Sequence, residues 1–196
     1  MPQPDHNPFA TRFTRPGALR YLFPPGESAD SLVEKLRQNN WRGEIIGPHG
    51  SGKSTLLAEL IPRLTEAGRI VVHHVLRQGE HSLPFSRQDA AGWNEATQVI
   101  VDGYEQLSWW GKRRLLSRVN ARQAGLLITA HEPMGLPTLL ATQPSLPLAR
   151  QIVSQLVPSG DTTISDEDVT RVFGSHQTNL REMLFSLYDL YQQRRG

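Results

Sequence analysis

The chain has 196 residues, of which 38% are hydrophobic and 20% are charged, and 21 Lys and Arg against 19 Asp and Glu leave a net charge of +2. This length and apolar content fit one domain, or one domain with a small appendage, and exclude a long coiled coil and a charge-driven disordered chain. There is no cysteine, which excludes disulfides, thiolate zinc sites and cysteine nucleophiles.

The sequence carries no membrane or export signal that we recognise. No apolar run approaches the ~18 residues that a membrane-spanning helix needs. The opening segment, MPQPDHNPF, lacks the basic and then apolar pattern of a signal peptide. We therefore expect a soluble cytoplasmic protein without membrane contact.

Residues 1–30 are rich in Pro, Gly, Arg and aromatic residues and predict an irregular N-terminal arm. Beyond the arm, the expected elements are helices at 31–39 and 53–67, strands at 44–46, 69–76 and 98–101, a helix at 109–122, strands at 126–130 and 138–142, and helices at 148–157, 166–173 and 178–192. Strands that alternate with helices predict an α/β fold, with a five-stranded, mainly parallel sheet flanked by helices. The order divides the chain into a core at 31–145 and a small helical lid at 146–196.

The most specific pattern in the chain is a phosphate-binding loop between the first strand and the second helix. It matches G-x-x-x-x-G-K-[ST] in full, with Gly47, Pro48, His49, Gly50, Ser51, Gly52, Lys53 and Ser54, and Thr55 follows. Glycines let the backbone turn tightly and aim N–H groups at a polyphosphate, and the helix N-terminus adds its dipole. Lys53 supplies a point charge for the phosphate oxygens, and the Ser54 hydroxyl can ligate Mg²⁺.

An acidic residue ends the third strand, where Val99, Ile100 and Val101 lead into Asp102. This pattern predicts a Walker B aspartate that helps to hold Mg²⁺. Hydrolysis also needs a base that orients the attacking water. Because the position after the aspartate is Gly103, the nearest candidate is Glu105, with Glu80 and Glu95 as further candidates.

Together with two further segments, these motifs resemble the AAA+ ATPases over roughly residues 31–192. Leu126 to His131 is similar to the sensor 1 strand, with Thr129 as the polar residue that reads the γ-phosphate. Thr178 to Leu184 resembles the segment that opens a lid helix and carries the sensor 2 arginine, here Arg181. The resemblance implies a nucleotide-dependent switch that binds Mg²⁺ and ATP, hydrolyses ATP to ADP and phosphate, and couples this reaction to lid movement.

Two alternatives share the same phosphate loop. One is a small-molecule kinase, against which the second strand counts because it ends in His73-His74-Val75-Leu76 without an acid. The other is an ATP-binding adaptor that does not hydrolyse ATP. The absence of Glu after Asp102 leaves the hydrolysis rate open, and no arginine stands out as an arginine finger among Arg113, Arg114, Arg118 and Arg150.

The remaining features concern partners. We expect a protein partner or self-assembly, while the basic helix face from Lys112 to Arg122 leaves nucleic acid as a further possibility. Trp109 and Trp110 are expected to anchor the start of this helix against the sheet. In the family that the chain resembles, the segment before the first strand often packs near the adenine base, and the resemblance therefore makes Pro8 and Phe9 candidates for an adenine pocket.

Overall fold

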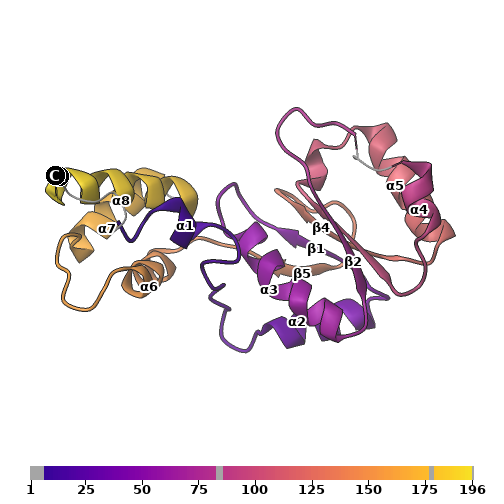
Figure 1. The fold of residues 1–196 in the computed structure, drawn as a ribbon, viewed down its shortest axis with the longest axis horizontal. Helices are drawn as coiled ribbons and strands as arrows, with labels where there is room; N and C mark the ends of the chain where they lie inside the picture. The colour runs from indigo at the N-terminus through magenta and orange to yellow at the C-terminus, as the bar shows by residue number, and fades with distance from the viewer. Residues whose placement is uncertain (1–6, 83–85, 177–178, 196) are drawn as a thin grey trace. The chain divides into compact units, whose positions relative to one another are not determined.

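The computed structural model describes residues 7–82, 86–176 and 179–195. The chain divides into two compact units: the helical unit, with residues 1–22, 48–55 and 142–196, and the sheet unit, with residues 23–47 and 56–141. The elements in chain order (Figure 1) are α1 (Thr11–Thr14), α2 (Ala29–Gln38), β1 (Arg42–Ile46), α3 (Lys53–Glu66), β2 (Ile70–Val75), α4 (Arg87–Ala91), β3 (Thr97–Asp102), the 3₁₀ turn η2 (Tyr104–Gln106), α5 (Trp109–Ala121), β4 (Gly125–Ala130), β5 (Thr138–Ala141), α6 (Leu146–Leu156), α7 (Asp166–His176) and α8 (Leu180–Arg195).

The sheet unit is built on five parallel strands in the order β2-β3-β4-β1-β5. Every residue of β3 and β4 is buried, as expected for central strands of a parallel sheet covered on both faces. The register pairs Ile46 with Ala130 and Val101 with Ile128. The carboxyl ends of β1, β3 and β4 therefore meet at one edge of the sheet.

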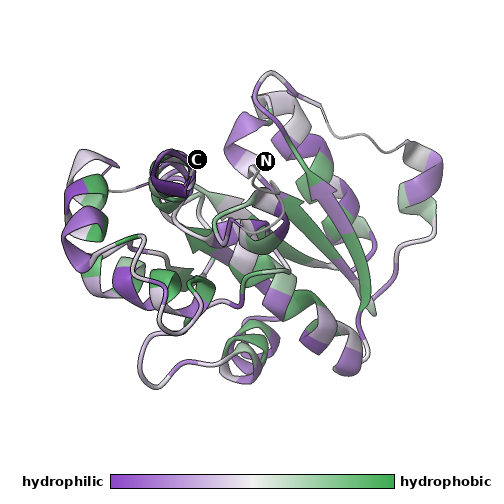
Figure 2. Cartoon of the chain, turned by 60° about the vertical axis from the view of Figure 1, so that its left-hand side comes forward, coloured by the Kyte–Doolittle hydropathy of each residue, from purple (hydrophilic) through white to green (hydrophobic). Residues whose placement is uncertain are grey.

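Helices cover both faces of this sheet, with α2 and α3 on one face and α4 and α5 on the other (Figure 1). Leu115 and Val119 of α5 belong to one buried cluster with Val99 and Ile128 of the strands. The strands are mostly hydrophobic, whereas the helices alternate between hydrophobic and hydrophilic residues (Figure 2). The predicted fold class, an α/β sheet flanked by helices, is thereby confirmed.

The helical unit packs α6, α7 and α8 around an apolar cluster of its own. Phe9 inserts into this cluster and is 1% exposed, with its ring edge-on to Tyr191 at 6.1 Å between centroids. The proposed role of Phe9 in an adenine pocket is therefore wrong, because core packing leaves no face of its ring for a base.

Charged groups complete the helical unit. Asp168 accepts hydrogen bonds from Arg194 at 2.9 Å and Arg171 at 2.8 Å, and these bonds hold its pKa well below the ordinary value, Arg194 contributing most. The Thr163 and Tyr191 hydroxyl groups act in the same way on Asp161 and lower its pKa to about 2. This unit is therefore held by ionised carboxylates as well as by apolar contacts.

Several helix ends and interiors have local causes. Ser28 caps α2, since its Oγ accepts from Ser31 N–H at 3.0 Å. Pro62 lies inside α3 without ending it, because the helix continues to Glu66. The last predicted helix begins at Leu180 in the structure, and Thr178 lies outside the described residues. No described helix is long and apolar enough to cross a membrane.

The predicted anchoring role of Trp109 and Trp110 is wrong. Both begin α5, but their side chains are 58% and 66% exposed. At about 100° per residue, Trp110 falls on the side of the helix away from Leu115 and Val119, which carry the contact with the sheet. The helical period thus places the aromatic pair at the surface.

Candidate functional site

The predicted site residues fall into two groups, one in each unit. Gly47, Asp102, Glu105 and Thr129 belong to the sheet unit, whereas residues 48–55 and Arg181 belong to the helical unit. Gly47 directly follows β1, and its N–H donates to the carbonyl of Ala130 at 3.1 Å. The first residue of the phosphate loop is therefore held at the sheet edge where β4 ends.

The phosphate loop has the local geometry that its motif predicts. Gly50 and Gly52 have φ of +67° and +98°, in the left-handed region that favours glycine, and α3 begins immediately afterwards at Lys53. The Lys53 side chain is largely buried, and its Nζ donates to the Pro48 carbonyl at 2.8 Å. Ser54 and Thr55 lie in the first turn of α3. A helix N-terminus with an adjacent lysine suits an anionic ligand.

Two contacts of the loop were not predicted from the sequence. The buried Ser51 hydroxyl lies 2.6 Å from the Thr142 hydroxyl, directly after β5. The Tyr21 ring lies against Gly52, since a Cβ added there would be 3.5 Å from its Cε2 atom. Burial raises the pKa of Tyr21 to about 12, so this hydroxyl stays neutral. Neither Thr142 nor Tyr21 belongs to a motif, and only folding brings these two residues to the loop.

The start of α8 packs directly on the phosphate loop. The Leu180 N–H donates to the Gly50 carbonyl at 3.1 Å, and the Asn179 side chain caps α8 by accepting from Glu182 N–H at 3.1 Å. A Cβ on Gly50 would overlap the Asn179 amide oxygen, so this approach requires glycine. Arg181 follows in the first turn of α8 and is exposed. The segment predicted to read the nucleotide thus touches the predicted phosphate site.

At the sheet edge, Asp102 and Thr129 are paired. The fully buried Thr129 hydroxyl donates to Asp102 Oδ1 at 2.5 Å and accepts from Gly103 N–H at 2.9 Å. Gly103 has φ of +87°, and a Cβ there would lie 2.8 Å from the Leu76 carbonyl oxygen. This close approach and the left-handed φ explain why a glycine follows Asp102.

Glu105 is held by a residue that the sequence did not single out. It lies on the turn η2, and its Oε1 is 3.2 Å from Nε2 of His131, the residue directly after β4. The Glu105 Oε2 atom is buried and has no hydrogen-bond partner. Buried carboxylate oxygens without partners are uncommon, and they mark places where a further group is expected.

The other candidates have different surroundings. Glu80 is exposed and accepts from the Arg77 N–H at 2.9 Å, and Glu95 is exposed as well. Arg150 forms an ion pair with Asp166 at 2.7 Å. Among the described residues, no group of three or more His, Asp or Glu could hold a metal ion without other ligands.

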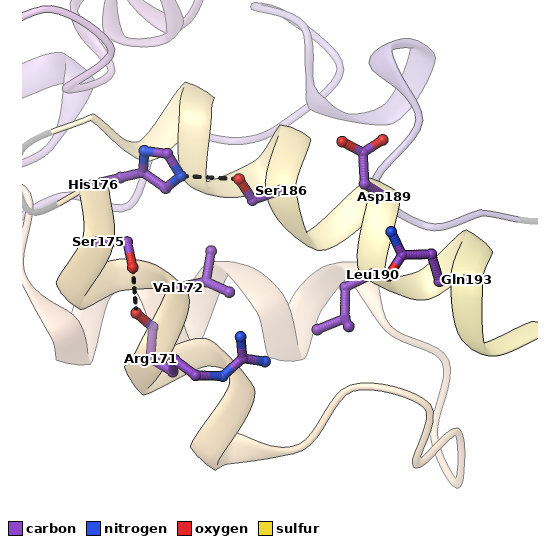
Figure 3. A pocket seen from close by; sticks show the side chains of 8 residues that line it. All are labelled: Arg171, Val172, Ser175, His176, Ser186, Asp189, Leu190 and Gln193. Atoms are coloured by element: carbon purple, nitrogen blue, oxygen red, sulfur yellow. Dashed lines mark hydrogen bonds between the residues drawn. The ribbon is translucent and has the colours of Figure 1, made fainter.

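A separate hollow of about 300 Å³ lies between α7 and α8 (Figure 3). Its lining includes Arg171, His176, Ser186 and Asp189, none of which was predicted as a site residue. Arg171 is already paired with Asp168, and the His176 ring lies 2.9 Å from the Ser186 hydroxyl. Three of its polar groups thus have partners within the helical unit.

No protein-family model matches the sequence, and no curated protein does so either. Solved structures do resemble it. The chain is similar to Cdc6p from Pyrobaculum aerophilum, with a TM-score of 0.61 and 15% identity over 94% of this chain and 65% of that one. It is also similar to the Saccharomyces cerevisiae Hsp104–ADP complex, with a TM-score of 0.58 and 13% identity over 92% and 32% of the two chains.

A third similar structure is the Walker-type ATPase of Pyrococcus abyssi, with a TM-score of 0.53 and 11% identity over 90% of this chain and 72% of that chain. The chain spans less than two thirds of Cdc6p and about one third of Hsp104. At these identities the likeness concerns the arrangement of helices and strands alone, and it agrees with the parallel sheet described above. The chain therefore has the fold of the AAA+ type of P-loop ATPase.

Proposed function

We propose that the chain is a nucleotide-dependent switch that binds Mg²⁺ and ATP and couples ATP hydrolysis to movement of its helical lid. The observation that carries this proposal is the hydrogen bond from Leu180 at the start of α8 to Gly50 of the phosphate loop. It gives the lid a direct contact with the segment that would hold the phosphates. The ADP bound in the Hsp104 structure supports an adenine nucleotide as the ligand.

In the helical unit, the residues act by binding. The backbone N–H groups of the loop and Lys53 would hold the β- and γ-phosphates, and Ser54 offers a hydroxyl oxygen to Mg²⁺. Arg181, at the positive end of α8, would contact the γ-phosphate, which ADP lacks. A contact of this kind favours the closed lid only to the extent that it binds ATP more tightly than ADP.

In the sheet unit, the residues act on the reaction. Asp102 offers carboxylate oxygens of the kind that Mg²⁺ prefers, and a bound ion would neutralise charge on the β- and γ-phosphates. Thr129 would fix the orientation of the Asp102 carboxylate through the 2.5 Å hydrogen bond. Through the same hydrogen bond it would sense the γ-phosphate. Glu105, held by His131, would orient the attacking water through its unpartnered Oε2.

Titration calorimetry with a non-hydrolysable ATP analogue and with ADP tests the role of Arg181. Since a charge-assisted contact is worth about 1.5–3 kcal/mol, Arg181→Ala should reduce the ratio of ATP to ADP affinity by about ten- to hundredfold and leave ADP binding nearly intact. Arg181→Lys should restore the ratio only in part, because a point charge cannot make a bidentate contact. An unchanged ratio would make Arg181 an ordinary surface arginine. Arg37→Ala, an exposed arginine of α2, is the matched control.

A second candidate function is an ATP-binding adaptor without hydrolysis. It is favoured by Gly103 directly after Asp102 and by the engagement of Glu105 with His131. Phosphate release distinguishes the two functions: the switch releases phosphate from ATP, at least slowly, whereas the adaptor binds ATP and releases none. A small-molecule kinase would stay silent in the same assay until its acceptor is added.

A further inference from the structure

The surface at the start of α5 combines exposed aromatic rings with positive charge. Trp109 and Trp110 are more than half exposed, and their rings meet edge to face at 4.5 Å between centroids. The Arg113 guanidinium lies over the Trp109 ring at 4.9 Å. Large aromatic side chains at the surface of a helix whose other side packs into the core call for an explanation by function.

The charged residues that follow these rings in the sequence, up to residue 131, are all positive. From residue 106 to residue 131 the sequence contains no Asp or Glu, whereas Lys112, Arg113, Arg114, Arg118 and Arg122 all lie there. Arg113, Arg114 and Arg122 are exposed, and no ion pair within the described residues involves any of these three. The chain as a whole has a net charge of only +2, so this concentration is local.

We propose that this surface, the α5 surface, binds single-stranded nucleic acid. Unpaired bases stack on exposed aromatic faces, and phosphates pair with Arg and Lys, so a strand uses both kinds of group at once. An acidic polypeptide would pair with the Arg and Lys side chains but would leave the two indole rings unused. A duplex keeps its bases stacked on one another and would leave the two indole rings unused. Single-stranded nucleic acid is therefore the ligand that matches the whole surface, and its binding is independent of the proposed ATPase function.

Fluorescence anisotropy with a labelled oligothymidylate of about 20 nucleotides, titrated with the full chain at several salt concentrations, tests this proposal. Affinity should fall steeply with salt because phosphate contacts release counterions. Trp109→Ala combined with Trp110→Ala should weaken binding by about tenfold or more, while Phe in both positions should retain most of it. Arg113→Ala and Arg114→Ala should each reduce the slope of log affinity against log salt by about one.

Two matched controls and two competing ligands complete the experiment. Phe185→Ala and Arg37→Ala remove another exposed aromatic ring and another exposed arginine, and both should leave binding unchanged. Absence of binding at low salt would overturn the proposal, as would binding that the Trp and Arg variants leave unaltered. Equal or tighter binding of a duplex or of polyglutamate, or self-association that depends on the two Trp residues, would assign the α5 surface to that ligand instead.

Discussion

The helical unit and the sheet unit carry candidate residues of opposite chemistry. The helical unit holds the phosphate loop with Lys53 and the N-terminus of α8 with Arg181, which are positive or N–H-donating groups. The sheet unit holds the two carboxylates, Asp102 and Glu105, each bonded to a residue at the end of β4. This division teaches that nucleotide affinity and turnover should be separable by mutation, affinity depending on the helical unit and turnover on the sheet unit.

The largest expected effect tests the sheet unit. Glu105→Gln removes the group proposed to orient water and should lower the rate of phosphate release by about 10²–10⁴-fold, while ATP affinity stays within a factor of about two. Steady-state phosphate release and calorimetric titration with an ATP analogue measure the two quantities. Glu34→Gln, at an exposed glutamate of α2 in the same unit, is the control. Equal rates in Glu105→Gln and the unmodified chain would remove Glu105 from the proposal.

The next effect tests the helical unit. Lys53→Ala should weaken ATP binding by about ten- to hundredfold, because a charge-assisted contact with phosphate is worth about 1.5–3 kcal/mol, and turnover should be lost with it. The same titration measures the affinity, with Lys35→Ala on the exposed side of α2 as the matched lysine control. Unaltered ATP affinity in Lys53→Ala would contradict the identification of the phosphate loop.

The smallest effect concerns the stability of the helical unit. Because Asp168 and Asp161 have lowered pKa values, their contribution is present above about pH 4, the ordinary value, and is lost as the pH falls towards about 2. Asp168→Asn should lower the melting temperature at pH 7 by about 3–10 °C. It should also make the melting temperature fall less steeply as the pH is lowered. Thermal unfolding between pH 7 and pH 3 measures both. If Asp189→Asn, at an exposed position of α8, has an equal effect, Asp168 has no special role.

Motifs and periodic patterns predicted the elements but not the contacts between them. The apolar runs predicted all five strands, and Gly47 to Ser54 predicted a loop between β1 and α3, because these signals are local in the chain. The pairing of Glu105 with His131 depends on the register of β3 against β4, which the sequence does not display. The exposure of Trp109 and Trp110 could have been predicted, since the positions of Leu115 and Val119 already define the buried side of α5.

Glu44, in β1, has a consequence for the rigidity of the candidate site residues in the sheet unit. It is buried, and its carboxylate accepts hydrogen bonds from the Met134 and Leu136 N–H groups at 2.8 and 3.2 Å and from the Thr138 hydroxyl at 3.1 Å. The connection from β4 to β5, which begins with His131, is thereby fixed to β1. Part of the conformational entropy of this connection is lost when the chain folds, so less of it remains to be lost when a ligand binds. His131 therefore presents Glu105 from a preorganised backbone.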